Sequence, residues 1–182
     1  MYFSKQGENN TKETIEFSLK YAKERGIKNI VVASTTGKTA KLLKDFEHNV
    51  VMVTYANGVN GKGIPAVTSK EVKELEEDGI KVFTGTHVLS GAERALSRQF
   101  GGVSPVEIMA HTLRMLGQGT KVAVEVAVMA LDAGLIPYGE DIIAIGGSSH
   151  GADTALVISP SHASSILDTK IREVICKPQN WD

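Results

Sequence analysis

The sequence predicts an α/β fold: a three-layer, open and mainly parallel sheet with helices on both faces and an antiparallel portion late in the chain. Apolar, β-branched runs alternate with helical patterns along most of the chain, as is typical of β-α-β units. The runs 141–145 and 154–158 are separated by a short connection, which suits a hairpin rather than a parallel crossover. With 182 residues, the chain is expected to form one domain, residues 1–182.

The N-terminal segment is expected to hold a short strand at residues 1–3, followed by a helix. Asn10 and Glu13 have the spacing of a capping box at the start of this helix, and Gly26 provides a stop signal at its end. The apolar run 29–34 comes next and predicts the first central strand of the sheet.

A second helix is expected over residues 37–47. Ala40, Leu43 and Phe46 recur there at helical spacing, so that they would share one face. Residues 50–55 are apolar and rich in β-branched side chains, and they predict the next strand.

The segment 57–63 is rich in glycine and asparagine, which predicts a mobile loop. Thr68 and Glu71 then form a capping box for a helix that stops at Gly79. Residues 81–84 predict a short strand after it.

Two helices are expected next. The first contains Leu96 and ends before Gly101. The second has the strongest start signal of the chain, because Ser104, Pro105 and Glu107 supply an N-cap, a proline at the first helical position and a capping glutamate.

Residues 120–133 fit two structures. Valines alternate from Val122 to Val128, as in a strand, whereas the interspersed alanines and the stop signal at Gly134 favour a helix. We predict the helix. Residues 171–176 are expected to form the last strand.

Composition and charge limit the partners and the cellular location that we expect for this protein. The net charge is −1 without a basic block, which argues against a nucleic-acid partner. No apolar run is long enough to span a bilayer, and the N-terminus has no signal-peptide core, so we expect no membrane partner. Cys176 is the only cysteine and is interpreted as a buried, inert thiol, which fits the cytoplasmic location that we expect.

The turn after the strand 29–34 is the most informative motif. It combines hydroxyl groups and a lysine where a helix begins, which predicts a phosphate-binding turn formed by Ser34, Thr35, Thr36, Gly37, Lys38 and Thr39. The Gly-Lys-Thr sequence is not an NTP-binding loop, because Val32 stands where that loop requires glycine. The alternative interpretation is a helix cap in which Thr36 satisfies backbone N–H groups, and the sequence leaves both open.

Two further turns follow predicted strands. One contains Gly85, Thr86 and His87, and the other contains Gly146, Gly147, Ser148, Ser149, His150 and Gly151. If the strands before the three turns are parallel, all three turns lie at one edge of the sheet, where open α/β sheets bind ligands. The alternative for the last turn is a flexible hairpin loop.

Several polar residues are candidates for chemistry. His150 and Asp153 could act as an acid/base pair, although such residues more often cap turns. Arg94, Arg98 and Arg114 could clamp an acidic ligand, although a solvated helix face is the interpretation that we favour. Lys121 is a weaker candidate for a phosphate ligand. No His, Cys, Asp or Glu cluster has the spacing of a metal site.

Two segments resemble the C-terminal domain of pyruvate kinase. Asn29–Ala40 looks like its strand and Ser-Gly-x-Thr/Ser-Ala loop, and Gly139–Gly147 is similar to its Gly-Asp-x-Val strand entry, continued by His150–Leu156. The segments Ser90–Arg94, Phe100–Gly102 and Leu113–Val122 look like the stand-alone pyruvate kinase α/β domain-like proteins of archaea and bacteria.

The resemblance implies a fold more than an activity. Pyruvate kinase performs its chemistry in a barrel domain, for which this chain has no room. In some of those enzymes the C-terminal domain binds a sugar-phosphate effector at the loop that matches Ser34–Thr39, so a phosphorylated ligand is implied here. Lys38 departs from the family's loop, which puts the identity of that ligand in doubt.

Three hypotheses follow. The leading one is binding of a phosphorylated small molecule between the turns 34–39 and 146–151. FMN is a candidate because it carries one phosphate and a flat ring, and the sequence does not choose it over a sugar phosphate. The second is an enzyme that uses His150 and Asp153 on such a ligand. The third is a regulatory or assembly subunit whose residues 122–136 form a homo-oligomer surface, although we favour a core helix for that stretch.

Overall fold

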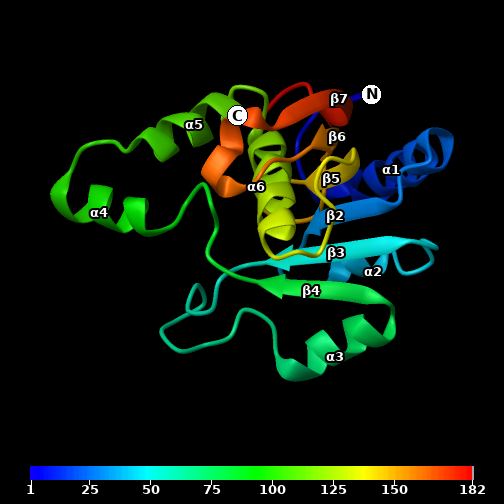
Figure 1. Cartoon of the computed structure of the whole chain (residues 1–182), viewed down its shortest axis with the longest axis horizontal. Coiled ribbons are helices and arrows are strands. Elements are labelled where there is room, and N and C mark those ends of the chain that lie inside the picture. Colours follow the sequence, from blue (N-terminus) through cyan, green and yellow to red (C-terminus); the bar gives the residue numbers. More distant parts are fainter. Residues whose placement is uncertain (182) are drawn as a thin grey trace.

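The computed structural model describes residues 1–181. One sheet of seven strands runs through the molecule, with helices packed on both of its faces (Figure 1). The strands are β1 (Tyr2–Phe3), β2 (Asn29–Ala33), β3 (Asn49–Thr54), β4 (Ile80–Thr84), β5 (Ile142–Gly146), β6 (Thr154–Ser159) and β7 (Lys170–Pro178). The helices are α1 (Thr11–Arg25), α2 (Lys38–Lys41), α3 (Ser69–Glu77), α4 (Ala92–Phe100), α5 (Pro105–Arg114) and α6 (Gln118–Asp132), with the short 3₁₀ helices η1 (Glu8–Asn10) and η2 (Ala163–Asp168).

The sheet has the strand order β1-β7-β6-β5-β2-β3-β4. Strands β5, β2, β3 and β4 are parallel to one another, whereas β6 is antiparallel to both β5 and β7. The short β1 closes the other edge of the sheet, parallel to β7. The predicted α/β class and the antiparallel portion late in the chain are therefore confirmed.

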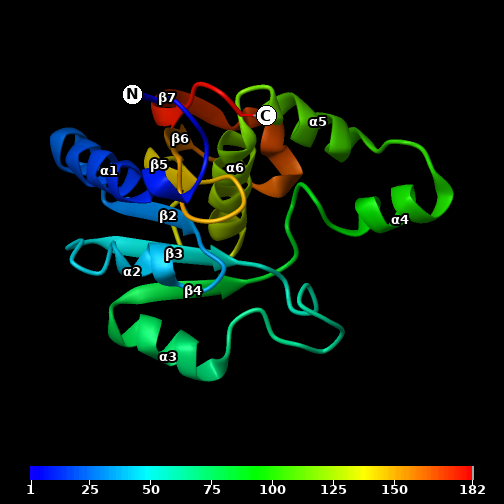
Figure 2. The same cartoon turned by 180° about the vertical axis from the view of Figure 1, so that it is seen from behind.

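Each face of the sheet has its own apolar core. Helices α1, α2 and α3 cover one face, where Ile30 and Val32 of β2 are fully buried (Figure 2). Helix α6 covers the other face, on which Val31 of the same strand is buried. Because both faces are covered, the central strands are continuous apolar runs rather than alternating ones, as expected for a parallel sheet.

Helix α6 covers Gln118–Asp132, so the helix predicted for residues 120–133 is confirmed, with its last residue forming the C-cap. Nearly all side chains of α6 are buried, because the sheet lies on one side of it and α5 and η2 pack against it elsewhere. A helix that is apolar almost all round belongs in a core. The hypothesis that residues 122–136 form a homo-oligomer surface is therefore wrong, because residues 123–131 are buried within the chain.

Two local predictions need correction. The helix expected at 37–47 is a single turn, α2, after which i→i−3 bonds from Leu43 and Phe46 carry the chain into the core. The capping box expected at Asn10 does not form, because its side-chain amide donates to Lys5 O at 2.8 Å instead. The capping boxes at Thr68 and Ser104 are both present.

Helices α4 and α5 form an arm that extends away from the sheet (Figure 1). Helix α4 buries none of its residues, and α5 buries only Ala110. The two helices are held to each other by Glu107, which accepts a hydrogen bond from Ser97 Oγ at 2.5 Å. No helix within residues 1–181 has the length and apolar character needed to cross a bilayer.

Candidate functional site

The three predicted turns meet at one edge of the sheet. The turns 34–39, 85–87 and 146–151 follow β2, β4 and β5, which are parallel, so their carboxyl ends point the same way. Strands β2 and β5 are neighbours, and the chain leaves β2 toward β3 on the other side. Such a point of diverging connections is where open α/β sheets bind ligands.

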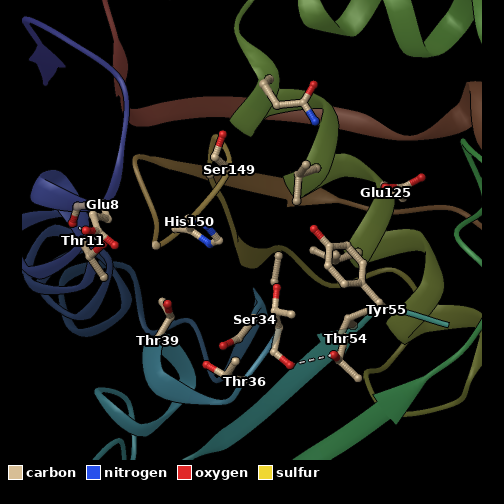
Figure 3. Close-up of a pocket in the computed structure, with 18 of the residues that line it drawn as sticks. Glu8, Thr11, Ser34, Thr36, Thr39, Thr54, Tyr55, Glu125, Ser149 and His150 are labelled. Carbon is tan, nitrogen blue, oxygen red and sulfur yellow. Dashed lines mark hydrogen bonds between the residues drawn. The ribbon is translucent and has the colours of Figure 1, made fainter. Parts of the chain in front are cut away.

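A cavity of about 1120 Å³ opens at this edge (Figure 3). In Figure 3 the side chains of Ser34, Thr36 and Thr39 lie along its lower border, with His150 and Ser149 above them. Of the residues predicted for the site, those that line the cavity are Ser34, Thr35, Thr36, Lys38, Thr39, His87, Gly147 and His150. The turns 34–39 and 146–151 therefore do face a shared space.

The other predicted residues do not line the cavity: Gly37, Gly85, Thr86, Gly146 and Ser148. Two of these glycines have a structural role instead. Gly37 has a φ of 82°, a conformation that favours glycine. A Cβ on Gly146 would lie 2.3 Å from Gly119 O, so glycine is needed there for α6 to approach β5.

The turn 34–39 is held at its start and leaves its later amides free. Ser34 N donates to Val53 O at 3.1 Å, and Thr54 Oγ1 donates to Thr35 O at 3.2 Å. Within residues 1–181 the amides of 35–39 find no acceptor. The alternative interpretation, in which Thr36 caps the helix, is wrong, because the N-cap is Gly37 and no side chain bonds there. A one-turn helix adds little dipole, so the free amides and hydroxyls are the relevant anion-binding groups.

The turn after β5 does not supply an acid/base pair. His150 is exposed at the cavity, and its side chain makes no hydrogen bond or ion pair within the described part of the chain. Asp153 is fully buried, and its carboxylate accepts hydrogen bonds from Gly7 N at 3.0 Å and Thr154 Oγ1 at 2.8 Å. The carboxylate of Asp153 thus fixes the N-terminal segment and β6, and it does not reach His150.

A buried charged cluster forms another part of the cavity wall. The Glu125 carboxylate accepts a hydrogen bond from Lys121 Nζ at 2.5 Å and lies 3.3 Å from His87 Nδ1. Its other oxygen accepts from Leu89 N at 2.9 Å. His87 Nε2 is buried without a hydrogen-bond partner in the described chain, beside the ring of Tyr55.

The charges in this cluster perturb one another. Burial favours the neutral acid of Glu125, but the hydrogen bond from His87 and the charge of Lys121 outweigh it and hold the pKa of Glu125 below its usual value. Burial lowers the pKa of Lys121, and the carboxylate of Glu125 opposes that shift. An ionised pair inside a cavity wall is typical of functional sites, although structural ion pairs show it too.

The sequence analysis only partly predicted the charged end of the cavity, which is the part lined by Arg94, Arg114, Gln118, Lys121 and Glu125. Arg94, Arg114 and Lys121 all line the cavity, although the sequence favoured a solvated face for the arginines, and Gln118 and Glu125 were missed. The spacing i,i+4 between Lys121 and Glu125 on a helix otherwise almost free of charge was the available signal.

Two further kinds of site, a metal cluster and a reactive thiol, concern the acidic, histidine and cysteine side chains. Within 1–181, no group of three or more His, Cys, Asp or Glu side chains could hold a metal ion. Cys176 is buried, and burial raises the pKa of its thiol to about 11, so it is an inert core residue as predicted.

Comparison with known proteins gives a family and a set of similar structures. The family described as "Pyruvate kinase, alpha/beta domain" matches residues 12–158, well over half of the chain. Among solved structures, a pyruvate kinase from Cryptosporidium parvum matches over 75% of this chain and 20% of its own, at 15% identity and a TM-score of 0.39. The same organism's pyruvate kinase in complex with ADP matches over 89% and 23%, at 15% identity and a TM-score of 0.40. The chain thus spans about a fifth of the length of these enzymes.

Proposed function

Because the chain belongs to the pyruvate kinase alpha/beta domain family, we propose that it binds a phosphorylated small molecule in the cavity at the carboxyl edge of its sheet. The observation that carries the proposal is the turn after β2. It offers unpaired backbone amides at 35–39, beside the hydroxyl groups of Ser34, Thr36 and Thr39 and the ammonium of Lys38, at the border of the cavity. Consecutive free amides with hydroxyls and a cation are the donor set that a phosphate requires.

We propose FMN as one ligand of this class. The cavity volume of about 1120 Å³ exceeds what a phosphate alone fills and lies near the roughly 300–1,000 Å³ common for small-molecule sites. Tyr55 and His87 line the wall with their ring centroids 5.5 Å apart, and an aromatic wall suits a flat ring system. A sugar phosphate would use the same phosphate contacts and not the aromatic wall.

The test compares FMN with riboflavin, which lacks the phosphate, by quenching of flavin fluorescence. In the double variant Lys38→Ala/Thr39→Val we expect the dissociation constant for FMN to rise about tenfold or more, because charge-assisted hydrogen bonds to the phosphate are lost. Lys41→Ala is the matched control, since Lys41 belongs to the same short helix but pairs with Glu74 outside the cavity. Equal binding of FMN and riboflavin, or unchanged FMN binding in the double variant, would contradict the proposal.

A homo-oligomer is a second proposal, and the unburied arm of α4 and α5 favours it. Leu96 and Phe100 of α4 are 59% and 80% exposed. A helix of nine residues is barely stable in water unless its apolar side chains pack against something, so a partner surface is expected to cover them. We propose that a second copy of the chain covers α4. Leu96 and Phe100 are four residues apart and share one face of α4, so the same face of two copies can pack together in an isologous pairing.

A further inference from the structure

The charged end of the cavity lies apart from the turn 34–39 and is built from different elements. In Figure 3, Glu125 lies well to one side of Thr36 and Thr39. Arg94 of α4, Arg114 of α5 and Lys121 of α6 line the cavity at this end, together with Gln118 and Glu125. A phosphate held by the turn after β2 does not use any of these side chains.

Most donors of this cluster have no protein partner. The side chain of Arg94 makes no hydrogen bond or ion pair within the described residues. The side chain of Arg114 uses only Nε, which donates to Gln118 Oε1 at 2.7 Å. The terminal nitrogens of Arg114 therefore stay available, and so does the Gln118 amide nitrogen. Planar guanidinium groups with free terminal nitrogens are suited to bidentate contact with an anionic oxygen group.

The cluster has more positive than negative charge. Lys121 is 3% exposed and is compensated by Glu125, and Arg94 acts on the carboxylate of Glu107. The cluster therefore holds three cations against two carboxylates. Burial lowers the pKa of Lys121 most, Glu125 opposes this, and Arg114 and Arg94 lower it further, so the three cations lie close enough to repel one another. An anion placed between them would relieve this repulsion.

We propose that this end of the cavity is a second anion site, which binds a carboxylate or phosphate group through Arg94, Arg114 and Lys121. The site would accept either a second anionic group of the ligand or a separate small anion. It adds to the proposed function but does not depend on it, because the two sites share no residue.

The experiment resolves the two sites in one titration by NMR. Inorganic phosphate and malonate, which supplies carboxylates, are each added to the ¹⁵N-labelled protein at constant ionic strength. The arginine Nε–Hε signals of Arg94 and Arg114 report on the charged end, and the backbone amides of 35–39 report on the turn. We expect saturable shifts at both arginines with at least one of the anions, and the anion that saturates identifies the group.

Variants test whether the side chains of the cluster themselves bind the anion. Arg114→Gln should raise the dissociation constant read at Arg94 about tenfold or more. Should that variant fold poorly, the exposed Arg94→Gln, read at Arg114, replaces it. Arg98→Gln is the matched control, because Arg98 lies on the same helix as Arg94 but does not line the cavity. Shifts that do not saturate with either anion, or that are equally large at Arg98, would overturn the second site, whatever the amides of 35–39 show.

Discussion

At the residue scale, the pair of Lys121 and Glu125 is the most consequential feature of the site. Both side chains are almost completely buried, and each is the main counter-charge of the other. A buried pair need not stabilise a fold relative to apolar residues, but removing one partner leaves an uncompensated charge. The pair is therefore better explained by what it does at the cavity than by its contribution to stability.

This argument predicts an asymmetric response to mutation. Lys121→Met should lower the free energy of unfolding by about 3 kcal/mol, because the buried carboxylate of Glu125 loses its ammonium partner and keeps only the ring nitrogen of His87 and uncharged donors such as Leu89 N. The double variant Lys121→Met/Glu125→Gln should recover much of that loss, because a neutral amide can still accept the hydrogen bond of Leu89. Urea unfolding measures both values.

The control for this prediction is an exposed pair. Lys41 and Glu74 lie 3.3 Å apart with both side chains 44% exposed, so Lys41→Met should change stability by less than about 1 kcal/mol. A single variant Lys121→Met that is as stable as the wild type, or a double variant that is no better than the single one, would show that the pair is not coupled in the way described.

Single residues also show where sequence reasoning about the site succeeded and where it stopped. The hydroxyl groups of 34–39 were predictable because their position after a buried strand fixes their place at the sheet edge. Gly146 was assigned to the ligand, but the backbone of α6 occupies the space that its missing side chain leaves. Glycine in a sequence signals close approach, and only the fold tells what approaches.

At the element scale, burial determined the structure of two segments, the ambiguous stretch 120–133 and the segment 37–47, for which a longer helix was predicted. The alternating valines of α6 are explained by a helix covered on most sides, for which periodicity carries little information. Helix α2 has the apolar spacing of a longer helix, but Leu43 and Phe46 reach the core through 3₁₀-like turns. In both cases tertiary packing, which a local pattern does not contain, determined the outcome.

The arm of α4 and α5 carries the prediction about assembly. If a second copy covers α4, the molar mass from light scattering should rise with protein concentration toward that of a dimer. Phe100→Ser, which removes the most exposed large apolar side chain of the arm, should shift this equilibrium toward the monomer. Leu167→Ser is the matched control, because Leu167 is 85% exposed in η2, which is not part of the arm. A wild-type molar mass that stays at the monomer value at all protein concentrations would contradict the proposed dimer.

At the scale of the whole molecule, the α/β class and the edge that holds the site follow from the sequence. The alternation of strands and helices predicts a parallel sheet, and a parallel sheet brings the carboxyl ends of β2, β4 and β5 together. The charged end was not predictable in this way. Arg94, Arg114 and Lys121 converge only because α6 packs on the sheet, α5 packs on α6 and α4 packs on α5, and no local motif encodes that convergence.

The central claim is that the turn after β2 receives a phosphate group. The most direct measurement is an anomalous difference map from crystals of the protein soaked in arsenate, which has the shape and charge of phosphate. The account predicts an arsenic peak at this turn, placed so that the arsenate oxygens accept hydrogen bonds from the backbone amides of 35–39. A map with well-occupied arsenic peaks elsewhere and none at this turn would contradict it.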